Sequence, residues 1–283
     1  MPLSSNSPFT HTVTSWLDLQ KHLFDVSFDT GINRFRQGLV FRGLNSVTYH
    51  RMQTSLMRLG GEFAKKERHL IRNFRKYAYL DVNVGDSDWH WLAVGQHYGL
   101  PTRLLDWTYS PYVAAHFATS DLTCMDDDGL VYAVDVDVTN LSLPPRLRTI
   151  IDTEGAHVFT PDLLRANGID IATFDQIGGD FVAFLEPPSL DQRIVNQFAV
   201  FSVMSNPALL LNDWLQTNAI PYREYVIPGD LKWEVRDKLD QANITERVIF
   251  PGPGGLSSWL TRHYYTKPSA ANPTRSSERN AKP

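Results

Sequence analysis

The sequence predicts an α+β fold. Some segments carry apolar residues at the spacing of a helix, others form short apolar runs typical of strands, and the strand-like segments are separated both by helices and by hairpin-length gaps. An ordered βαβ array needs a crossover helix between successive parallel strands, so this irregular spacing favours α+β over that alternative.

The first expected elements are a helix and a strand. Ser15 and Asp18 form a capping box before a segment with helical spacing, whose apolar positions are Trp16, Leu19, Leu23 and Val26. The run 38–43 is apolar between two glycines, which favours a strand that ends in a turn at Gly43. Arg42 is therefore expected at a strand end.

Three helices are expected next. The first places a cluster of Lys and Arg opposite an apolar face formed by Phe63, Leu70, Ile71, Phe74 and Tyr77. Ser87 can cap a second helix that ends near Gln96. The pair 110–111 joins a capping serine to a proline at the first helical position, which predicts a third helix over 112–118.

The second half of the chain is expected to hold the remaining strands. Apolar alternation and short apolar runs predict strands at 130–138, 181–185, 198–203 and 222–227, with short helices within 205–217 and 230–242. The segment from about 139 to 178 is expected to be a long, sparsely structured loop.

Composition places the chain among ordinary soluble globular proteins, with 283 residues of which 42% are hydrophobic and 20% charged. Cys124 is the only cysteine, so neither an internal disulfide nor a thiolate zinc site is expected. His and carboxylate residues are too scattered to predict a metal site. The sequence shows no leader pattern and no apolar stretch of membrane-spanning length, so we expect a cytoplasmic protein.

Charge is distributed unevenly along the chain. Residues 34–76 contain eleven Lys or Arg and two Glu, whereas residues 77–191 contain four Arg and eighteen Asp or Glu. If the basic stretch gathers on one face, it would attract nucleic acid or the phosphates of a nucleotide. The other interpretation is that Lys65, Lys66 and Arg68 only form the solvated side of an amphipathic helix.

The segment 95–118 concentrates reactive side chains in an expected turn between two helices. These are Gln96, His97, Thr102, Arg103, Asp106 and Trp107. Side chains on such a turn can converge on a ligand, and the N–H groups after Ser110 add a helix N-terminus that favours an anion. A structural role is open for each: Arg103 and Asp106 could be an ion pair that braces the turn, and His116 is expected to be a packed histidine.

Four motifs resemble the FRG domain family. They are Phe41-Arg42-Gly43, the block GQHYGLPTRLLDWTYSPYVAAHFA at 95–118, the segment 193–197, and VIFPGPGGL at 248–256. The resemblance extends from about Trp16 to Tyr265, and it implies a single domain over 15–265 after an N-terminal extension at 1–14. Residues 266–283 lack large apolar side chains and are expected to be a disordered tail.

The order of these motifs also resembles the ADP-ribosyltransferases, which implies a mixed or antiparallel β core flanked by helices. In that family an aromatic-Arg-Gly element ends the first core strand and its arginine holds NAD, which matches Arg42. The segment 110–118 matches the family's helix of the form xPxxAxxFA. The family's catalytic glutamate lies on the last core strand, where this chain has Gln197, with Glu186 eleven residues earlier.

The resemblance implies cleavage of the nicotinamide–ribose bond of NAD and assigns roles to side chains. The candidate catalytic residues are Arg42, His97, Asp106, Glu186 and Gln197. The candidate NAD-binding residues are Phe41, Arg42, Gly43, Gln96, Tyr98, Thr102, Arg103, Trp107, Ser110 and Arg193. The arginines would bind phosphate, the aromatic rings would stack on nicotinamide, a carboxylate would act on the ribose or the acceptor, and Gln197 could only hydrogen-bond.

The implied function is NAD-dependent mono-ADP-ribosylation of a nucleic acid base or of a protein, as a toxin or an anti-phage effector. A base must be reached unstacked, which favours single-stranded nucleic acid and an exposed aromatic ring such as Trp89, Trp91 or Trp107. Two alternatives stay open: a non-catalytic module that binds a nucleotide or nucleic acid, and a metal-independent hydrolase that uses His97 and Asp106. No membrane partner is expected, and the sequence leaves the oligomeric state open.

Overall fold

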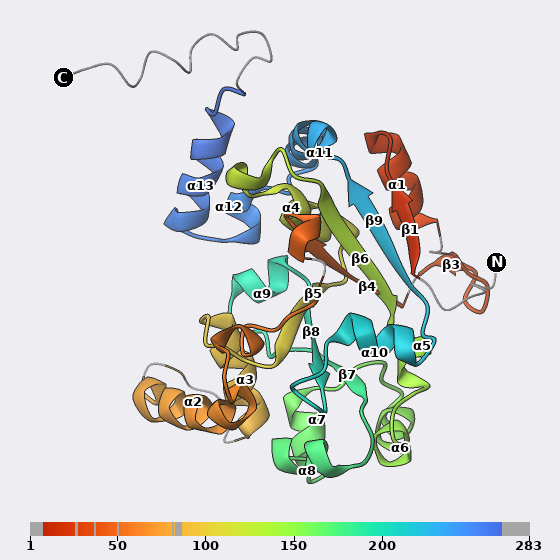
Figure 1. Cartoon of the computed structure of the whole chain (residues 1–283), viewed down its shortest axis with the longest axis vertical. Helices are drawn as coiled ribbons and strands as arrows, with labels where there is room; N and C mark the ends of the chain where they lie inside the picture. Colours follow the sequence, from red (N-terminus) through yellow and green to blue (C-terminus); the bar gives the residue numbers. More distant parts are fainter. Residues whose placement is uncertain are drawn as a thin grey trace.

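A computed structural model describes residues 8–25, 28–36, 38–49, 51–80, 82 and 87–267. Its centre is a seven-stranded sheet in the order β1-β9-β6-β4-β5-β8-β7 (Figure 1). The strands are β1 (Phe9–Thr12), β4 (Leu39–Leu44), β5 (Leu104–Thr108), β6 (Gly129–Asp135), β7 (Val182–Leu185), β8 (Ala199–Met204) and β9 (Tyr222–Ile227). Only β1 and β9 pair in parallel, so the expectation of a mixed, largely antiparallel sheet is confirmed.

Helices flank this sheet, and a small hairpin of β2 (Phe28–Asp29) and β3 (Arg34–Phe35) forms a second sheet. The helices are α1 (Trp16–Phe24), α2 (Phe63–Ala78), α3 (Asp88–His97), α4 (Pro111–Thr119), α5 (Val136–Asn140), α6 (Pro145–Glu154), α7 (Pro161–Ala166), α8 (Ile171–Gln176), α9 (Gln192–Asn196), α10 (Leu211–Thr217), α11 (Gly229–Gln241), α12 (Glu246–Ile249) and α13 (Pro253–His263). None of the helices in the described part of the chain is long and apolar enough to cross a membrane.

The capping serines start their helices where the sequence predicts. The Ser15 hydroxyl accepts a hydrogen bond from the Asp18 N–H at 3.1 Å, and the Ser87 hydroxyl accepts one from the Trp89 N–H at 3.2 Å. Each bond satisfies a backbone donor that the first turn of a helix leaves free. All four helices predicted in the first half of the chain, α1, α2, α3 and α4, are confirmed.

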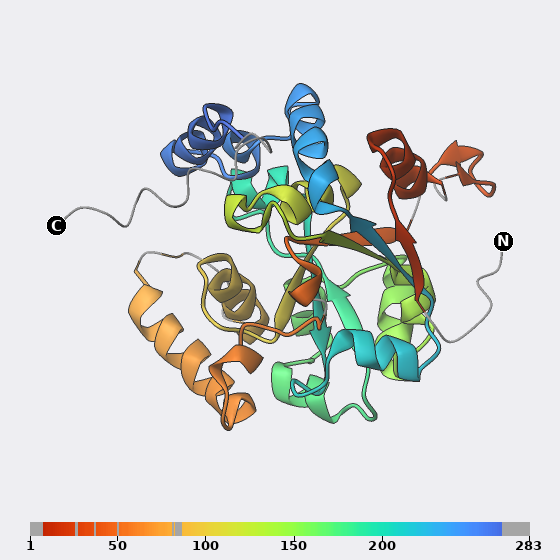
Figure 2. The ribbon, with the colours of Figure 1, turned by 45° about the horizontal axis from the view of Figure 1, so that its top comes forward.

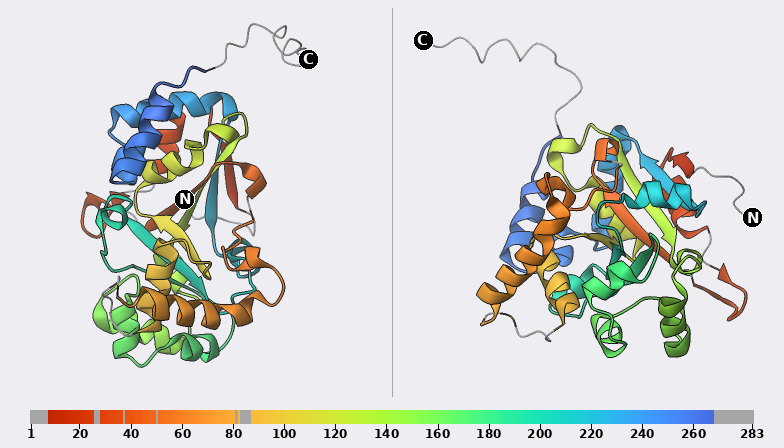
Figure 3. Two further views of the ribbon diagram at one scale, coloured as in Figure 1. Left: turned by 90° about the vertical axis from the view of Figure 1, so that its left-hand side faces the viewer. Right: turned by 60° about the horizontal axis from the view of Figure 1, so that its bottom comes forward.

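The sheet separates two hydrophobic cores. Helices α1, α4 and α11 cover one face of its β4-β6-β9 part, and Phe41 points into that core. The neighbouring Val40 points to the other face, into the larger core that includes Trp89, Trp107 and Phe184. Figure 3 shows the sheet between the C-terminal helices at one end and helices α2 and α6 to α8 at the other.

Gly43 fixes the contact between β4 and α4. A Cβ atom at this position would lie 1.9 Å from the Ala114 carbonyl oxygen and 2.8 Å from the Ala118 nitrogen. No side chain fits there, so the glycine allows the strand and the helix to touch through their backbones. This contact sets α4 directly beside Arg42.

Several sequence expectations for secondary structure are wrong. The segment 139–178 is not a sparse loop, because it contains the end of α5 and all of α6, α7 and α8. The expected strand 130–138 ends at Asp135, whose side chain caps α5. The expected turn within 96–107 includes most of β5.

The chain ends differ in how far the structure describes them. Part of the expected N-terminal extension forms β1, which adds an edge strand to the sheet beside β9. The expected disordered tail lies outside the described residues from 268 onward.

We predict that Gly43→Ala lowers the free energy of unfolding by about 1–3 kcal/mol, because the new methyl group must push β4 away from α4. Urea denaturation followed by circular dichroism measures this. Gly254→Ala is the matched control, since no heavy atom lies within 4 Å of the Cβ added there. Equal stability of the two variants would contradict the close packing of β4 on α4.

Candidate functional site

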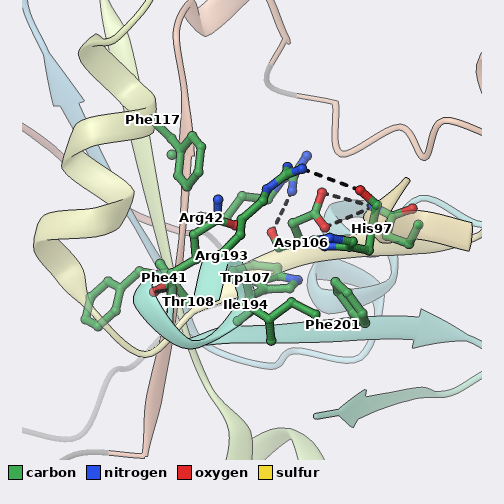
Figure 4. A pocket seen from close by; sticks show the side chains of 14 residues that line it. Phe41, Arg42, His97, Asp106, Trp107, Thr108, Phe117, Arg193, Ile194 and Phe201 are labelled. Atoms are coloured by element: carbon green, nitrogen blue, oxygen red, sulfur yellow. Dashed lines mark hydrogen bonds between the residues drawn. The ribbon is translucent and has the colours of Figure 1, made fainter. Parts of the chain in front are cut away.

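Strands β4 and β5 part after a single register pair, and a cavity opens where they part. The pair joins Phe41 to Thr108, and β4 continues without β5 as its neighbour. The central cavity has a volume of about 240 Å³ (Figure 4). It is lined by Phe41, Arg42, Gly43, Gln96, His97, Asp106, Trp107, Thr108, Phe117, Arg193, Ile194, Gln197, Ala199 and Phe201.

Arg42 bridges the two parted strands. Its Nη1 donates a hydrogen bond to the Asp106 carbonyl oxygen at 2.6 Å, across the gap that a ladder bond would otherwise close. Burial lowers the pKa of this guanidinium and the Asp106 charge raises it, and an arginine keeps its charge under such shifts. Its Nε is buried and has no hydrogen-bond partner among the described residues.

Arg193 brings a second cation to the same cavity from α9. Its Nη1 donates to the His97 carbonyl oxygen at 3.4 Å, and its guanidinium carbon lies 5.1 Å from the centre of the Phe250 ring. Its buried Nε also lacks a partner in the part of the chain that the structure describes. Figure 4 shows the side chains of Arg42 and Arg193 directed toward the same part of the cavity.

Asp106 supplies the negative charge of the cavity. Gln96 Nε2 lies 3.0 Å from both carboxylate oxygens, and the Thr102 hydroxyl donates to Gln96 Oε1 at 2.5 Å. The hydroxyl bond fixes which way the amide points, so the amide presents its N–H groups to the carboxylate. Thr102 is fully buried and acts on the site only through Gln96.

His97 and Gln197 line the cavity, but the hydrogen-bonding partners of their side chains are residues that do not line it. His97 Nε2 lies 2.8 Å from Asp191 Oδ2, and the other oxygen of Asp191 caps α9. Gln197 Nε2 donates to the Ile249 carbonyl oxygen at 3.1 Å, which ties α9 to α12. The pair of His97 and Asp106 that the hydrolase alternative needs is not formed.

The structure therefore brings nine predicted site residues from three distant segments to one cavity: Phe41, Arg42, Gly43, Gln96, His97, Asp106, Trp107, Arg193 and Gln197. The remaining predicted residues have other roles.

Arg103 is a buried structural cation and does not pair with Asp106. Its Nε donates to Glu67 at 2.6 Å and its Nη1 to Asp175 at 2.5 Å, and both Arg103 and Glu67 are almost fully buried. Trp107 and Phe41 border the cavity, but their rings belong to the two cores, where Trp107 Nε1 donates to Ser202. Neither ring is free to stack on a ligand.

Other expected contacts also lie elsewhere. The Ser110 hydroxyl is used to cap α4, accepting from the Val113 N–H, and Glu186 accepts a hydrogen bond from the Tyr109 hydroxyl at 2.8 Å. Neither residue lines the central cavity, nor does the exposed Tyr98. Gly43 lines it, but the packing against α4 already explains the glycine.

Sequence reasoning missed two residues at the site. Asp191 joins α9 to α3, and the signal for it was available, since an aspartate before a short helical run is a typical N-cap. Phe117 contributes the aromatic ring that lines the cavity from α4, in the place expected for Phe41, Tyr98 or Trp107.

An adjacent cavity of about 380 Å³ shares Arg42, Gly43 and Phe117 with the central one. Its other lining residues include Tyr49, Arg51 and Arg58 from the basic stretch. The charge of Arg58 lowers the pKa of Arg42, which places these two cations close enough to repel each other. Arg42 thus stands between two cavities in a region of positive potential.

The basic helix α2 is less available than the sequence suggests. Lys65 Nζ pairs with Glu62 at 2.6 Å and Lys66 Nζ donates to the Gly60 carbonyl oxygen. The expectation that Trp89 or Trp91 offers an exposed aromatic ring is wrong, because both side chains are buried. The interpretation of Lys65 and Lys66 as the solvated side of an amphipathic helix fits these contacts.

Fold and site define a mixed α/β protein whose central sheet holds a charged cavity between two parted strands. Residues 37–127 match the family model of the FRG domain, so this part of the chain is similar to that family. The match includes the Phe41-Arg42-Gly43 motif and the block at 95–118. No curated protein and no solved structure matched the chain.

We predict that Arg103→Met destabilises the protein by roughly 3–5 kcal/mol, because it leaves Glu67 buried without its cation. Lys65→Ala breaks an exposed ion pair and should cost less than about 1 kcal/mol. Thermal and urea unfolding of both variants measure the difference. A small effect of Arg103→Met would show that the buried pair is dispensable.

Proposed function

We propose that this protein is an NAD-dependent mono-ADP-ribosyltransferase that transfers ADP-ribose to a nucleic acid base or to a protein. The observation that carries the proposal is the pair Arg42 and Arg193, two cations at one cavity whose buried Nε atoms lack partners among the described residues. Gln96 holds the carboxylate of Asp106 at the same cavity, and Arg42 donates to the backbone carbonyl oxygen of that residue.

The two cavities suit the two halves of NAD. Arg42 lies at their shared wall, where it can bind the pyrophosphate with its planar guanidinium while the halves extend to either side. Arg58 strengthens the positive potential there. In this arrangement the nicotinamide riboside occupies the central cavity beside Asp106, and Phe117 offers the ring on which nicotinamide stacks.

Transfer breaks the bond between ribose C1′ and the nicotinamide nitrogen, which keeps the electron pair, and forms a bond between C1′ and the acceptor. Asp106 is the one carboxylate among the described residues that line the central cavity. It is placed to stabilise the positive charge that develops on the ribose and to take the proton of the acceptor. Gln197 keeps only a hydrogen-bonding role, and Glu186 none at this cavity.

The acceptor would approach through the adjacent cavity. Arg51 and Arg58 are exposed there, and Tyr49 keeps 61% of its surface accessible. A basic wall with an exposed aromatic ring suits a single-stranded nucleic acid, whose phosphates and unstacked bases it can contact. A protein acceptor is the alternative. An experiment with labelled NAD separates the two, because the label ends up either on nucleic acid or on a polypeptide.

A non-catalytic nucleotide-binding module is the second candidate. Gln197 favours it, because this residue stands where the resemblance to the transferases requires a catalytic glutamate. The same two arginines would then bind a nucleotide that is not consumed. Binding without turnover of NAD distinguishes this function from the first.

We predict that Arg42→Ala abolishes NAD binding, since the phosphate-binding cation at the shared wall is lost. Isothermal titration calorimetry of NAD measures binding, and the melting temperature should stay nearly unchanged. Arg165→Ala removes an exposed arginine from a surface pair with Asp162 and is the matched control. Full NAD binding by Arg42→Ala, together with a collapse in stability, would leave Arg42 with no role beyond its hydrogen bond across the two strands.

We predict that Asp106→Asn retains NAD binding and lowers transfer by roughly 100-fold or more, because the amide can neither take a proton nor carry negative charge. The assay incubates NAD labelled in its adenylate part with total nucleic acid or with lysate and follows the label. Label on oligonucleotides identifies a nucleic acid acceptor, and label on polypeptides alone identifies a protein acceptor. NAD that binds wild-type protein and is never consumed would favour the non-catalytic module.

A further inference from the structure

Three metal-binding side chains meet at the edge of the sheet, where β1 lies beside α1 (Figure 2). His11 comes from β1, and Asp18 and His22 come from α1. Their potential ligand atoms all lie within 4.8 Å of one another. This cluster is separate from both cavities, whose walls contain none of the three residues.

The three side chains face one another in an ordered way. His11 Nε2 lies 3.0 Å from Asp18 Oδ2, and His22 Nδ1 lies 3.1 Å from Asp18 Oδ1, so each carboxylate oxygen meets one imidazole nitrogen. The two imidazole rings stack with centroids 3.8 Å apart and planes 19° apart. Asp18 and His22 are one helical turn apart and therefore project from the same side of α1.

These separations are close to those of a tetrahedral metal site. Zinc bonds of about 2.0–2.1 Å hold neighbouring ligand atoms roughly 3.3 Å apart. The two nitrogen–oxygen distances, each to a different oxygen of Asp18, fall near that value, and the stacked rings would tilt toward each other so that both nitrogens point at one ion. The ion would replace the imidazole N–H protons, which leave as the metal binds.

Thr14 orients the carboxylate from its outer side. Its backbone N–H donates to Asp18 Oδ2 at 2.9 Å, and its hydroxyl donates to the same oxygen at 3.2 Å. Oδ1 faces His22, whose Nδ1 also lies 2.9 Å from the Asp18 backbone carbonyl oxygen and would exchange that contact for the ion, and Oδ1 is the oxygen left to coordinate. Metal-bound carboxylates commonly receive such outer hydrogen bonds, which fix their orientation.

We propose that His11, Asp18 and His22 form a binding site for Zn²⁺, with water as the fourth ligand. Two imidazoles and one carboxylate are a donor set that zinc accepts, and their side chains remain 20–28% exposed, which leaves a path for the ion and room for the water. The ion would join an edge strand of four residues to the helix that follows it, and so attach the N-terminal segment to the domain.

Zinc titration of the full-length protein tests this site independently of NAD. The protein is stripped with a chelator and titrated with ZnCl₂ against a chromophoric chelator, and Co²⁺ is added in a second experiment to report the coordination geometry. We expect one equivalent of Zn²⁺ to bind, the intense visible absorption of tetrahedral Co²⁺, and a rise in melting temperature on adding zinc.

Variants locate the bound ion. His11→Ala and His22→Ala should each weaken zinc binding by roughly 100-fold or more. Each variant removes a direct ligand, and loss of a residue that only orients a ligand already costs up to about 100-fold. His157→Ala is the matched control, since His157 also pairs with an aspartate but has no second histidine in its pair. The wild-type stoichiometry and Co²⁺ spectrum decide the matter even if a variant fails to fold.

Two results would overturn the site. The first is the lack of saturable zinc binding, or an octahedral Co²⁺ spectrum, in wild-type protein. The second is unchanged zinc binding in folded His11→Ala and His22→Ala. Either result leaves the NAD proposal untouched, because the cluster and the cavities share no residue.

Discussion

The parting of β4 from β5 is the constraint on which the rest of the site depends. Two strands in the middle of a sheet normally share a ladder of backbone hydrogen bonds, yet here the register holds a single pair, Phe41 with Thr108. Beyond it the packing of Gly43 holds β4 on α4, and the Arg42 side chain donates to the Asp106 carbonyl oxygen across the gap. A charged side chain thus replaces a ladder bond, and the space between the strands becomes a polar cavity.

The polar groups of this cavity are held by residues that stand behind them. Thr102 orients Gln96, Asp191 joins His97 to the start of α9, and the Ile249 carbonyl oxygen fixes Gln197. Such support fixes the geometry before a ligand arrives, which is what a site must do if it is to stabilise charge that develops during a reaction. The positions of Gln96, His97 and Gln197 in the cavity therefore depend on contacts among α3, α9 and α12.

The sequence predicted elements well where a cap and a sustained apolar pattern coincide, as at Ser15, Ser87 and Ser110. It missed α7 and α8 within 139–178 because helices of six residues are too short to display a helical period. Their starts at Pro161 and Asp170 were readable only as local caps.

The sequence predicted site residues that lie in family motifs, but it could not predict contacts between side chains that are far apart in the sequence. Arg42, Asp106 and Gln197 were found by resemblance, and nothing in their spacing announces that they meet. Arg103 and Asp106 lie three residues apart, which suggested an ion pair as long as the segment was expected to be a turn. Asp106 lies in β5 and Arg103 directly precedes it, and along a strand a separation of three residues directs two side chains to opposite faces of the sheet. The partners of Arg103 are Glu67, 36 residues earlier, and Asp175, 72 residues later.

The extent of the family match has a consequence for how this domain can be divided. Residues 37–127 contain β4 and β5 but neither β6 nor β8, the strands that pair with them along their length. That stretch carries Arg42, Gln96, His97 and Asp106, while Arg193 and Gln197 follow much later in the chain. The segment by which the family is recognised is therefore not an autonomous unit. Any exchange, truncation or gene fusion that keeps this segment alone would carry over the motifs without Arg193 and Gln197, and so without a complete cavity.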